Sequence, residues 1–504
     1  MYPHPATTTP LPHIDYRWVF AASLLISAWL IAMDPLINRD AIIYLRAADA
    51  YLQSGLAASV DEFGRPILSV CMALMHQWTG IPTLWAGLLL VTLSYGLMCT
   101  GFVATVHTLG GDRRVQWLAA LVVLSHPMLN HTRSAIMRDP VYWALLVMSL
   151  REMLLYLRNP RPMHQLRWVA WVLLAALFRF EGLFFAVFAP LSLLFCKDLP
   201  NRLRHCLRLL IPQLLCIAIV GAGIALYLAQ QGETLLLFPA VHQYVDKLLA
   251  LPEEFSAVAA TTAEAMLNFT AREDAKIALA AGLASILLLN LCRAITWPWL
   301  LVLIWGRVSH LLVRFRRDDN TVLQAHILIG LSYLALFLLL NRFLLERYSN
   351  QVVIFLMLYV PFLLSTLWGA GGWRKYLVIA LLVVMAGDTL HTGDRDKRFI
   401  REATEWVRDN TPAQADIASN EKYIAYFSRR GFNWEAALGY GFKLQAIMEN
   451  PRHWQGVNYL VVYVRNRDEK AWGAFLQRNG LEELATFEGD KRRRGRVAVV
   501  AVSP

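Results

Sequence analysis

The sequence predicts a polytopic α-helical membrane protein that carries a small α/β domain at its C-terminal end. Three observations lead to this fold class. Only 17% of the 504 residues are charged and 57% are hydrophobic, whereas soluble domains usually carry about 25% charged residues. The apolar residues gather in many long runs, as membrane helices of about 20 residues require. After Asp394 the composition becomes polar and mixed.

The apolar runs are long enough to span, or nearly span, a bilayer at about eleven places. They lie at 18–34, 82–107, 115–130, 140–157, 168–180, 182–196, 206–230, 292–313, 322–341, 349–370 and 374–390. The two runs between 168 and 196 are short, so we expect them to form a hairpin buried within the bundle.

Arginine and lysine clusters fall on alternate loops, and the positive-inside rule places these loops on the cytoplasmic face. This bias accounts for much of the net charge of +11, and no nucleic-acid motif accompanies it. The alternation requires that 66–78 and 276–291 do not cross, so both are interpreted as short interfacial helices. Four regions then lie outside: 35–81, 131–139, 231–275 and everything after about 391.

We therefore expect a multi-pass membrane protein, with a transmembrane domain over 1–390 and an α/β domain outside the membrane over 391–504. In the latter, "REATEWVRDNTP" has helical spacing and stops at Thr-Pro. "ADIAS" predicts a short strand, and "NEKYIAYFS" predicts a helix that begins at Asn420. "YLVVYV" and "RVAVVAV" predict buried strands.

The first group of candidate functional residues follows the first span, in "INRDAIIYLRAADAYLQSG". Asp40 comes just after the membrane, and Tyr44 follows at helical spacing in a segment that ends in Ser-Gly. An amphipathic interfacial helix whose acid pairs with Arg39 or Arg46 is the structural alternative. It explains the helix but gives no reason for an acid at the membrane surface.

Two further groups also fall on the outer side. Arg138 and Asp139 precede a span, where an acid before proline can cap free helix N–H groups. Arg179 and Glu181, in "LFRFEGLFF", are the most deeply placed charges, and a charge at membrane depth indicates function and a partner. An Arg179–Glu181 or Glu181–Arg138 bridge is the structural alternative. Support of the site is favoured over direct catalysis for this pair.

The fourth group lies in "NRFLLERYSNQ", at the outer end of a span. It offers Arg342, Arg347 and Tyr348 at the depth of a lipid phosphate. Arginine binds phosphate bidentately and keeps its charge at any physiological pH. Snorkelling of the arginines towards headgroups is the structural alternative.

Together these groups predict transfer of a sugar from a polyprenyl phosphate to an acceptor hydroxyl. A carboxylate must take the hydroxyl proton, and cations must stabilise the departing lipid phosphate. Asp40 as base and Arg347 near the phosphate supply both functions. The chain has no GxGxxG or Walker motif for a nucleotide. The outer segment 231–275 contains a single histidine and scattered acids. This is not a metal-binding pattern, so no metal ligands are assigned.

These segments resemble GT-C superfamily glycosyltransferases, the bacterial relatives of protein O-mannosyltransferases and of lipid A aminoarabinose transferases. "RDAIIYLRAADAYLQSG" resembles their first outer loop, with matches at Asp40, Tyr44 and Gly55, and "GRPIL…WTGIP" resembles the interfacial segment after it. "FRFEGL" resembles their Arg-Pro-Glu-Gly-Leu motif and "ERYSNQ" their Arg-Tyr motif. "EWVRDNTPAQADIASNEKYIAYFSRR" resembles the start of their C-terminal outer domain.

The resemblance covers nearly the whole chain and implies inverting transfer from an undecaprenyl-phosphate sugar, with Asp40 as base and Arg347 at the phosphate. The acceptor is a glycan, a lipid or a protein. Many relatives have Asp-Glu where this chain has Asp40-Ala41, so Asp139 takes part of the second acid's role. Phe180 replaces the usual proline. These departures leave a divalent metal and the donor sugar open, and no cofactor is assigned.

Two other functions remain as alternatives. A transporter or flippase for lipid-linked saccharides usually shows internal repeats and broken helices, and no repeat is visible in this sequence. A polymerase or ligase using a diphosphate-linked oligosaccharide shares the same arrangement of acid and arginine. Only the identity of its donor would distinguish it.

Overall fold

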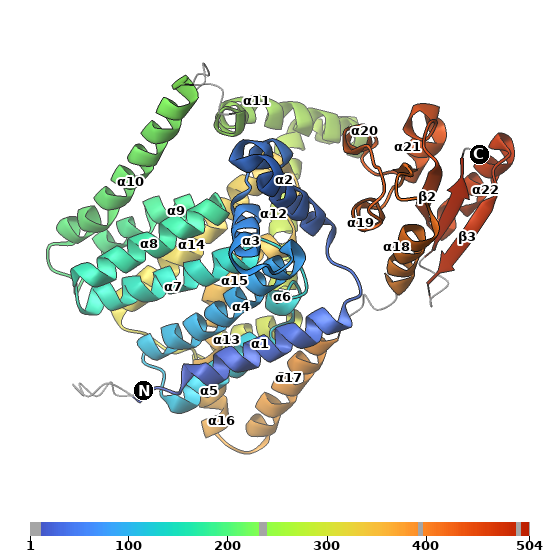
Figure 1. The fold of residues 1–504 in the computed structure, drawn as a ribbon. Coiled ribbons are helices and arrows are strands. Elements are labelled where there is room, and N and C mark those ends of the chain that lie inside the picture. The colour runs from blue at the N-terminus through green and yellow to red at the C-terminus, as the bar shows by residue number, and fades with distance from the viewer. Residues whose placement is uncertain (1–11, 231–238, 392–396, 490–494, 503–504) are drawn as a thin grey trace. The chain divides into compact units, whose positions relative to one another are not determined.

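A computed structural model describes residues 12–230, 239–391, 397–489 and 495–502, and Figure 1 follows its elements along the chain. The chain divides into two compact units. The first unit is Met1–Leu25, Val91–Thr132 and Arg138–Thr389, and the second unit is Ile26–Leu90, Arg133–Met137 and Leu390–Pro504. The predicted division at residue 390 stays a prediction.

Every regular element among the described residues of the first unit is a helix. Its elements are α5 (Arg113–Ser125), α6 (Pro127–Asn130), α7 (Asp139–Arg158), α8 (Pro162–Phe178), α9 (Glu181–Phe188), η1 (Pro190–Phe195), α10 (Arg202–Gln230), α11 (Pro239–Met266), η3 (Phe269–Asp274), α12 (Ala275–Ile295), α13 (Trp297–Val308), α14 (Arg317–Asn341), α15 (Glu346–Met357), α16 (Val360–Gly369) and α17 (Trp373–Leu390). Two more helices, α1 (Tyr16–Met33) and α4 (Thr83–Thr108), run from one unit into the other. One core that includes buried Trp143, Trp168 and Trp299 holds the unit together.

Six helices among the described residues are long and apolar enough to cross a membrane. They are Tyr16–Met33, Thr83–Thr108, Asp139–Arg158, Arg202–Gly223, Phe269–Ile295 and Arg317–Asn341. The pair α15 and α16, bent by 45°, makes a seventh if it counts as one span. The predicted fold class of a polytopic helical membrane protein is therefore confirmed. The predicted number of eleven spans stays a prediction.

Two predicted segments are wrong. The segment 276–291 is not a short interfacial helix, because it belongs to α12, whose 21 residues continue to Ile295. The span predicted at 292–313 is interrupted at Thr296, which has a φ of 68°. A new helix starts immediately after it with Pro298 in its first turn, where the missing proline N–H costs no intrahelical hydrogen bond.

The outer segment predicted as a long loop over 231–275 also needs correction. It contains α11, a helix of 28 residues, and the short helical segment η3. The stretch 231–238 lies outside the described residues. Pro252 lies within α11, and such a proline together with the many polar residues explains why the sequence looked irregular.

The second unit contains helices and a four-stranded sheet. Its elements are α2 (Arg39–Glu62), α3 (Ile67–Thr79), α18 (Arg398–Asn410), β1 (Ile417–Ala418), α19 (Lys422–Phe427), α20 (Trp434–Tyr440), α21 (Leu444–Glu449), η5 (Pro451–His453), β2 (Tyr459–Val464), η6 (Asn466–Asp468), α22 (Glu469–Asn479), β3 (Glu483–Glu488) and β4 (Arg496–Ala501). The three predicted strands and the predicted helix in "REATEWVRDNTP" are confirmed. The helix in "NEKYIAYFS" is also present, but it begins at Lys422 and not at Asn420, whose side chain bonds the Tyr463 backbone instead. The helix predicted to end at Ser-Gly instead bends at Gly55, where φ is 83°, and continues to Glu62.

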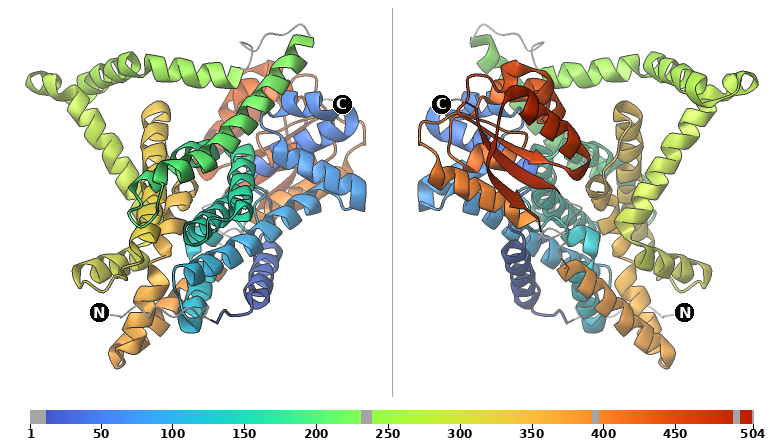
Figure 2. Two further views of the ribbon diagram at one scale, coloured as in Figure 1. Left: turned by 90° about the vertical axis from the view of Figure 1, so that its left-hand side faces the viewer. Right: turned by 90° about the vertical axis from the view of Figure 1, so that its right-hand side faces the viewer.

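The strands lie in the order β1-β2-β4-β3. β1 pairs with β2 in parallel, and the other two pairs are antiparallel. Alternate residues of β2 serve opposite faces. Leu460 and Val462 join the core beneath α20, α21 and α22, whereas Val461 joins the core beneath α18 and α19. The sheet is therefore covered by helices on both faces, as the two turned views of Figure 2 show.

Candidate active site

The segment "FRFEGL" joins α8 to α9 in the first unit. α8 ends at Phe178, Arg179 has an extended backbone, and Glu181 is the first residue of α9. Gly182 follows, and a Cβ at this position would lie 2.5 Å from the backbone nitrogen of Ala176 in α8. Glycine thus lets α9 begin against the backbone of α8, which fixes where Arg179 and Glu181 emerge.

Arg179 lies between two acids. Its Nε donates to Glu181 Oε1 at 2.9 Å, and its guanidinium also donates to Asp139 at the start of α7. The three side chains are nearly inaccessible, with 12% of Arg179 and 6% of each acid exposed. Burying charges is costly unless they are paired, so this group of one cation and two anions is a strong candidate for a functional centre.

Tyr348 of α15 adds an aromatic face to this centre. The Arg179 guanidinium lies over its ring, at 4.9 Å from the centroid, and the Arg347 guanidinium lies 5.4 Å from the same centroid. Nearby, Tyr142 of α7 donates to Gln351 Oε1 of α15 at 2.6 Å. The first unit therefore brings five predicted site residues into one neighbourhood: Asp139, Arg179, Glu181, Arg347 and Tyr348. We call them the Arg179 cluster.

The structure decides between the structural alternatives for Asp139 and for the Arg179–Glu181 pair. Asp139 is not the residue before α7 but its first residue, and α7 has no side-chain cap. Its carboxylate accepts from Arg179 instead, so the capping interpretation is wrong. The Arg179–Glu181 bridge is present. Arg342, in a left-handed conformation after α14, pairs with Glu254 of α11 at 2.9 Å.

The second unit contains the remaining predicted residues near the start of α2. Asp40 is the second residue of this helix, and its charge acts on Lys422 of α19. Arg39 donates two hydrogen bonds to Glu421, at 3.3 and 2.5 Å. Burial lowers the pKa of Lys422 below its ordinary 10.5, although the Asp40 carboxylate acts in the opposite direction.

Arg46 and Tyr44 hold the next turns of α2. Arg46 donates to Glu62 at 2.7 Å, and its guanidinium lies over the Trp434 ring at 3.9 Å from the centroid. Tyr44 is buried with its ring edge against Phe63. Arg39 pairs with Glu421, and Arg46 pairs with Glu62. These two ion pairs account for both arginines without the pairing to Asp40 that the structural alternative proposed.

Asp49, another acid of α2, was not among the predicted site residues. Asp49 accepts a hydrogen bond from the Tyr426 hydroxyl of α19 at 2.6 Å. Burial raises the pKa of Asp49 above its ordinary 3.8, although this hydrogen bond acts in the opposite direction. "NEKYIAYFS" predicted a helix correctly, but nothing local in it indicated that Glu421, Lys422 and Tyr426 would meet α2.

Among the residues that the structure describes, no three His, Cys, Asp or Glu side chains gather as metal ligands. Asp40 and Lys422 belong to the second unit, and the Arg179 cluster belongs to the first. Each group combines acids with cations. Acids can accept a proton, and cations can bind an anion.

The comparisons with known proteins add a likeness in fold. No protein-family model and no curated protein matches the sequence. Among solved structures, ArnT from Cupriavidus metallidurans bound to undecaprenyl phosphate is 14% identical, with 97% of this chain and 99% of that chain covered and a TM-score of 0.42. The oligosaccharyltransferase of Archaeoglobus fulgidus is 13% identical, with 91% and 69% covered and a TM-score of 0.46.

A mutant of the arabinofuranosyltransferase AftD from Mycobacteria is 14% identical, with 98% of this chain covered and a TM-score of 0.50. The alignment spans 42% of the AftD chain, so it concerns less than half of that protein. At this identity the likeness is one of fold. The fold of this chain is therefore similar to that of a solved glycosyltransferase, the arabinofuranosyltransferase AftD.

Proposed function

We propose that this chain is an integral-membrane glycosyltransferase that moves a sugar from an undecaprenyl-phosphate donor to an acceptor hydroxyl. The observation that carries the proposal is the Arg179 cluster, a buried group of charges at the ends of helices in a membrane protein. Buried charges of this kind mark substrate sites in membrane proteins. The fold shared with an arabinofuranosyltransferase supports glycosyl transfer as the reaction.

In the proposed reaction Asp40 is the general base. Its carboxylate takes the proton of the acceptor hydroxyl while the hydroxyl oxygen forms a bond to the anomeric carbon. The bond from that carbon to the phosphate oxygen breaks, and the lipid phosphate leaves with the electron pair. Attack opposite to the leaving group inverts the anomeric configuration. Lys422 supplies a positive charge that interacts with this carboxylate.

The departing lipid phosphate needs cations. Arg179 is already compensated by Asp139 and Glu181, which suits it to positioning rather than to holding the phosphate. We assign phosphate stabilisation to Arg347, with Tyr348 and Arg342 as further donor-site residues. Asp139 would be the second catalytic acid, in part of the role that a glutamate after Asp40 has in related enzymes. The residues that would support the site are Tyr44, Arg46, Arg138, Arg179 and Glu181.

The proposed setting is the periplasmic face of a bacterial inner membrane. The acceptor would be a glycan, a lipid or a protein, and membrane lipids would surround the helices. The alternation of basic loops along the sequence supports this orientation.

The test is sugar transfer in vitro by the purified full chain, wild type and Asp40→Asn, with undecaprenyl-phosphate sugars as donors. Loss of a general base lowers kcat by roughly a hundredfold to ten-thousandfold. Asp61→Asn is a matched control, because Asp61 is an exposed acid of the same helix. Transfer by Asp40→Asn at the wild-type rate would remove Asp40 from the mechanism.

A second measurement identifies the substrates and separates the alternatives. Mass spectrometry of envelope glycans and lipid-linked sugars from a deletion strain should show one lost sugar and an accumulated undecaprenyl-phosphate sugar. Accumulation of a diphosphate-linked oligosaccharide would point to a polymerase or ligase. Translocation of a lipid-linked sugar without a new glycosidic bond would point to a transporter.

A further inference from the structure

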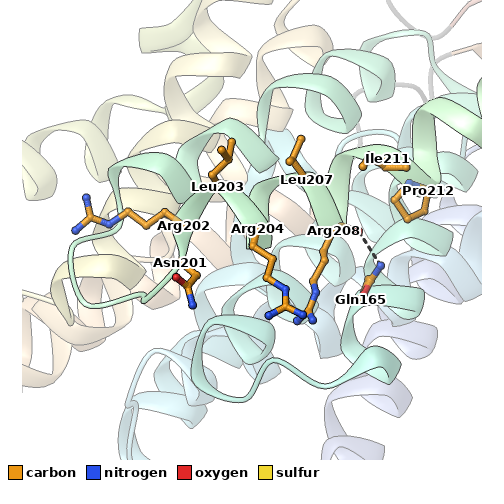
Figure 3. Close-up of a pocket in the computed structure, with 9 residues that line it drawn as sticks. All are labelled: Gln165, Asn201, Arg202, Leu203, Arg204, Leu207, Arg208, Ile211 and Pro212. Carbon is orange, nitrogen blue, oxygen red and sulfur yellow. Dashed lines mark hydrogen bonds between the residues drawn. The ribbon is translucent and has the colours of Figure 1, made fainter.

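A cavity of about 790 Å³ lies at the beginning of α10 in the first unit. It is not part of the Arg179 cluster, and none of the predicted site residues lines it. The residues that line it are Gln165, Asn201, Arg202, Leu203, Arg204, Leu207, Arg208, Ile211 and Pro212. Figure 3 shows that they come from the start of α10, from the residue before it and from α8.

The polar side of the cavity is strongly cationic. Three of its nine residues are arginines and none of the nine is acidic. Arg204 and Arg208 are four residues apart on one helix, which places them on the same face. Figure 3 shows their side chains extending to the same side of α10 with their guanidinium ends close together. Like charges at this spacing repel each other, so an anion between them would stabilise the arrangement.

Two acids of α7 and α14 have ion-pair partners outside the cavity lining. Glu152 of α7 accepts from Arg151 at 3.1 Å and from the His164 ring at 2.8 Å. Asp319 of α14 accepts from Arg158 at 2.8 Å. Neither carboxylate lines the cavity. Of the lining arginines, Arg202 donates to the Lys197 carbonyl at 3.1 Å.

The other side of the cavity is apolar. Leu203, Leu207 and Ile211 are 62%, 40% and 48% exposed, and Figure 3 shows Leu203 and Leu207 on the side of α10 opposite the two arginines. The same helix begins a candidate membrane span at Arg202. Gln165 Nε2 donates to the Arg208 carbonyl at 2.7 Å, which ties α8 to this turn. A fixed cationic site thus adjoins an apolar surface where a membrane helix begins.

We propose that this cavity binds the headgroup of an anionic phospholipid. The guanidinium groups would hold the phosphate by charge-assisted hydrogen bonds, and the exposed leucines and Ile211 would contact the acyl chains. Basic pockets between membrane helices bind acidic lipids by this combination of contacts. The site is separate from the proposed sugar transfer, and the orientation predicted from the sequence places it on the cytoplasmic side.

The test is native mass spectrometry of the purified full chain with dioleoyl phosphatidylglycerol and, separately, dioleoyl phosphatidylcholine. Arg204→Ala combined with Arg208→Ala should weaken phosphatidylglycerol binding by roughly thirtyfold, since each arginine near an anionic lipid contributes about 1 kcal/mol. Phosphatidylcholine binding should not change. Arg161→Ala combined with Arg167→Ala is the matched control, because both arginines are exposed and neither lines the cavity.

Three results would overturn the proposal. The first is equal retention of both lipids by the wild type, and the second is an equal loss of phosphatidylglycerol binding in the control variant and the cavity variant. The third is displacement of the lipid by inorganic phosphate at an equal concentration, which would assign the cavity to free phosphate instead. Sugar transfer should be unaffected by the cavity variant, so failure of this proposal is distinguishable from failure of the proposed function.

Discussion

The ring of Tyr348 faces the guanidinium of Arg179, with 4.9 Å between the guanidinium carbon and the ring centroid. This contact joins the turn between α8 and α9 to the "ERYSNQ" segment. Arg179 and Tyr348 are 169 residues apart in the sequence. A tyrosine ring attracts a cation through its negative face. Tyr348 therefore links the paired arginine of the cluster to Arg347, the residue assigned to the lipid phosphate.

The first prediction separates the ring of Tyr348 from its hydroxyl. A desolvated cation–π contact is worth about 1–2 kcal/mol, so Tyr348→Leu should lower kcat/KM for sugar transfer roughly fivefold to thirtyfold. Tyr348→Phe keeps the aromatic face and should stay within about twofold of the wild type. The two variants are compared by initial rates at limiting donor concentration. Equal losses in both would assign the effect to the hydroxyl instead of the ring.

The second prediction concerns the charge balance around Arg179. Arg179→Gln leaves Asp139 and Glu181 buried without their cation, which should cost about 3–5 kcal/mol of stability. The measurement is the midpoint of thermal unfolding in detergent. Arg342→Gln is the matched control, because its pair with Glu254 is exposed and should contribute at most about 1 kcal/mol.

A double variant tests whether the lost stability comes from the unpaired carboxylates. Adding Glu181→Gln to Arg179→Gln removes one of the two uncompensated acids, so part of the lost stability should return. If the double variant is less stable than Arg179→Gln alone, the cost does not come from unpaired carboxylates.

The spans with long uninterrupted apolar runs were predictable from the sequence. α4, α7 and α14 each lie in the predicted place, because about 20 apolar residues have one favourable arrangement in a bilayer. β2 and β4 were predictable for a related reason, since both are continuous apolar runs bounded by polar residues. β3, with the exposed alternation "ELATFE", was missed because it has no such run.

Other features depend on contacts that no local pattern encodes. Whether α12 ends at Ile295 or continues into the next apolar run was decided by Thr296 and Pro298, and hydropathy alone does not detect that break. Asp139 looked like a cap because Asp-Pro often begins a helix. Its actual partner, Arg179, is 40 residues away. The contact between Arg39 and Glu421 joins residues 382 apart.

The third prediction tests the close approach of α9 to α8. A Cβ at Gly182 would meet the backbone nitrogen of Ala176 at 2.5 Å, and backbone cannot move aside as a side chain can. Gly182→Ala should therefore destabilise the protein by about 1–3 kcal/mol. Gly282→Ala in α12 is the control, because no atom lies within 4 Å of its added Cβ. It should be neutral or stabilising by up to about 1 kcal/mol. Equal effects of the two substitutions would contradict the packing argument.

The fourth prediction uses the buried acid of α2. The pKa of Asp49 is raised above its ordinary 3.8, chiefly by burial, so the fold prefers the protonated carboxyl. A raised pKa in the folded state means that the contribution to stability is complete below about pH 3.8. That contribution is lost as the pH rises through the raised value. Above it, the folded protein bears the cost of an ionised, half-buried carboxylate.

Asp49→Asn removes this titration and keeps an oxygen that can accept from the Tyr426 hydroxyl. The midpoint of thermal unfolding of this variant, relative to wild type, should therefore rise as the pH increases from about 4 towards 7. Asp61→Asn changes an exposed acid of the same helix and should show no such trend. A difference between Asp49→Asn and wild type that is constant over this range, or that falls with pH, would mean that burial does not govern Asp49. In that case the hydrogen bond from Tyr426, which favours the ionised carboxylate, would be the stronger influence.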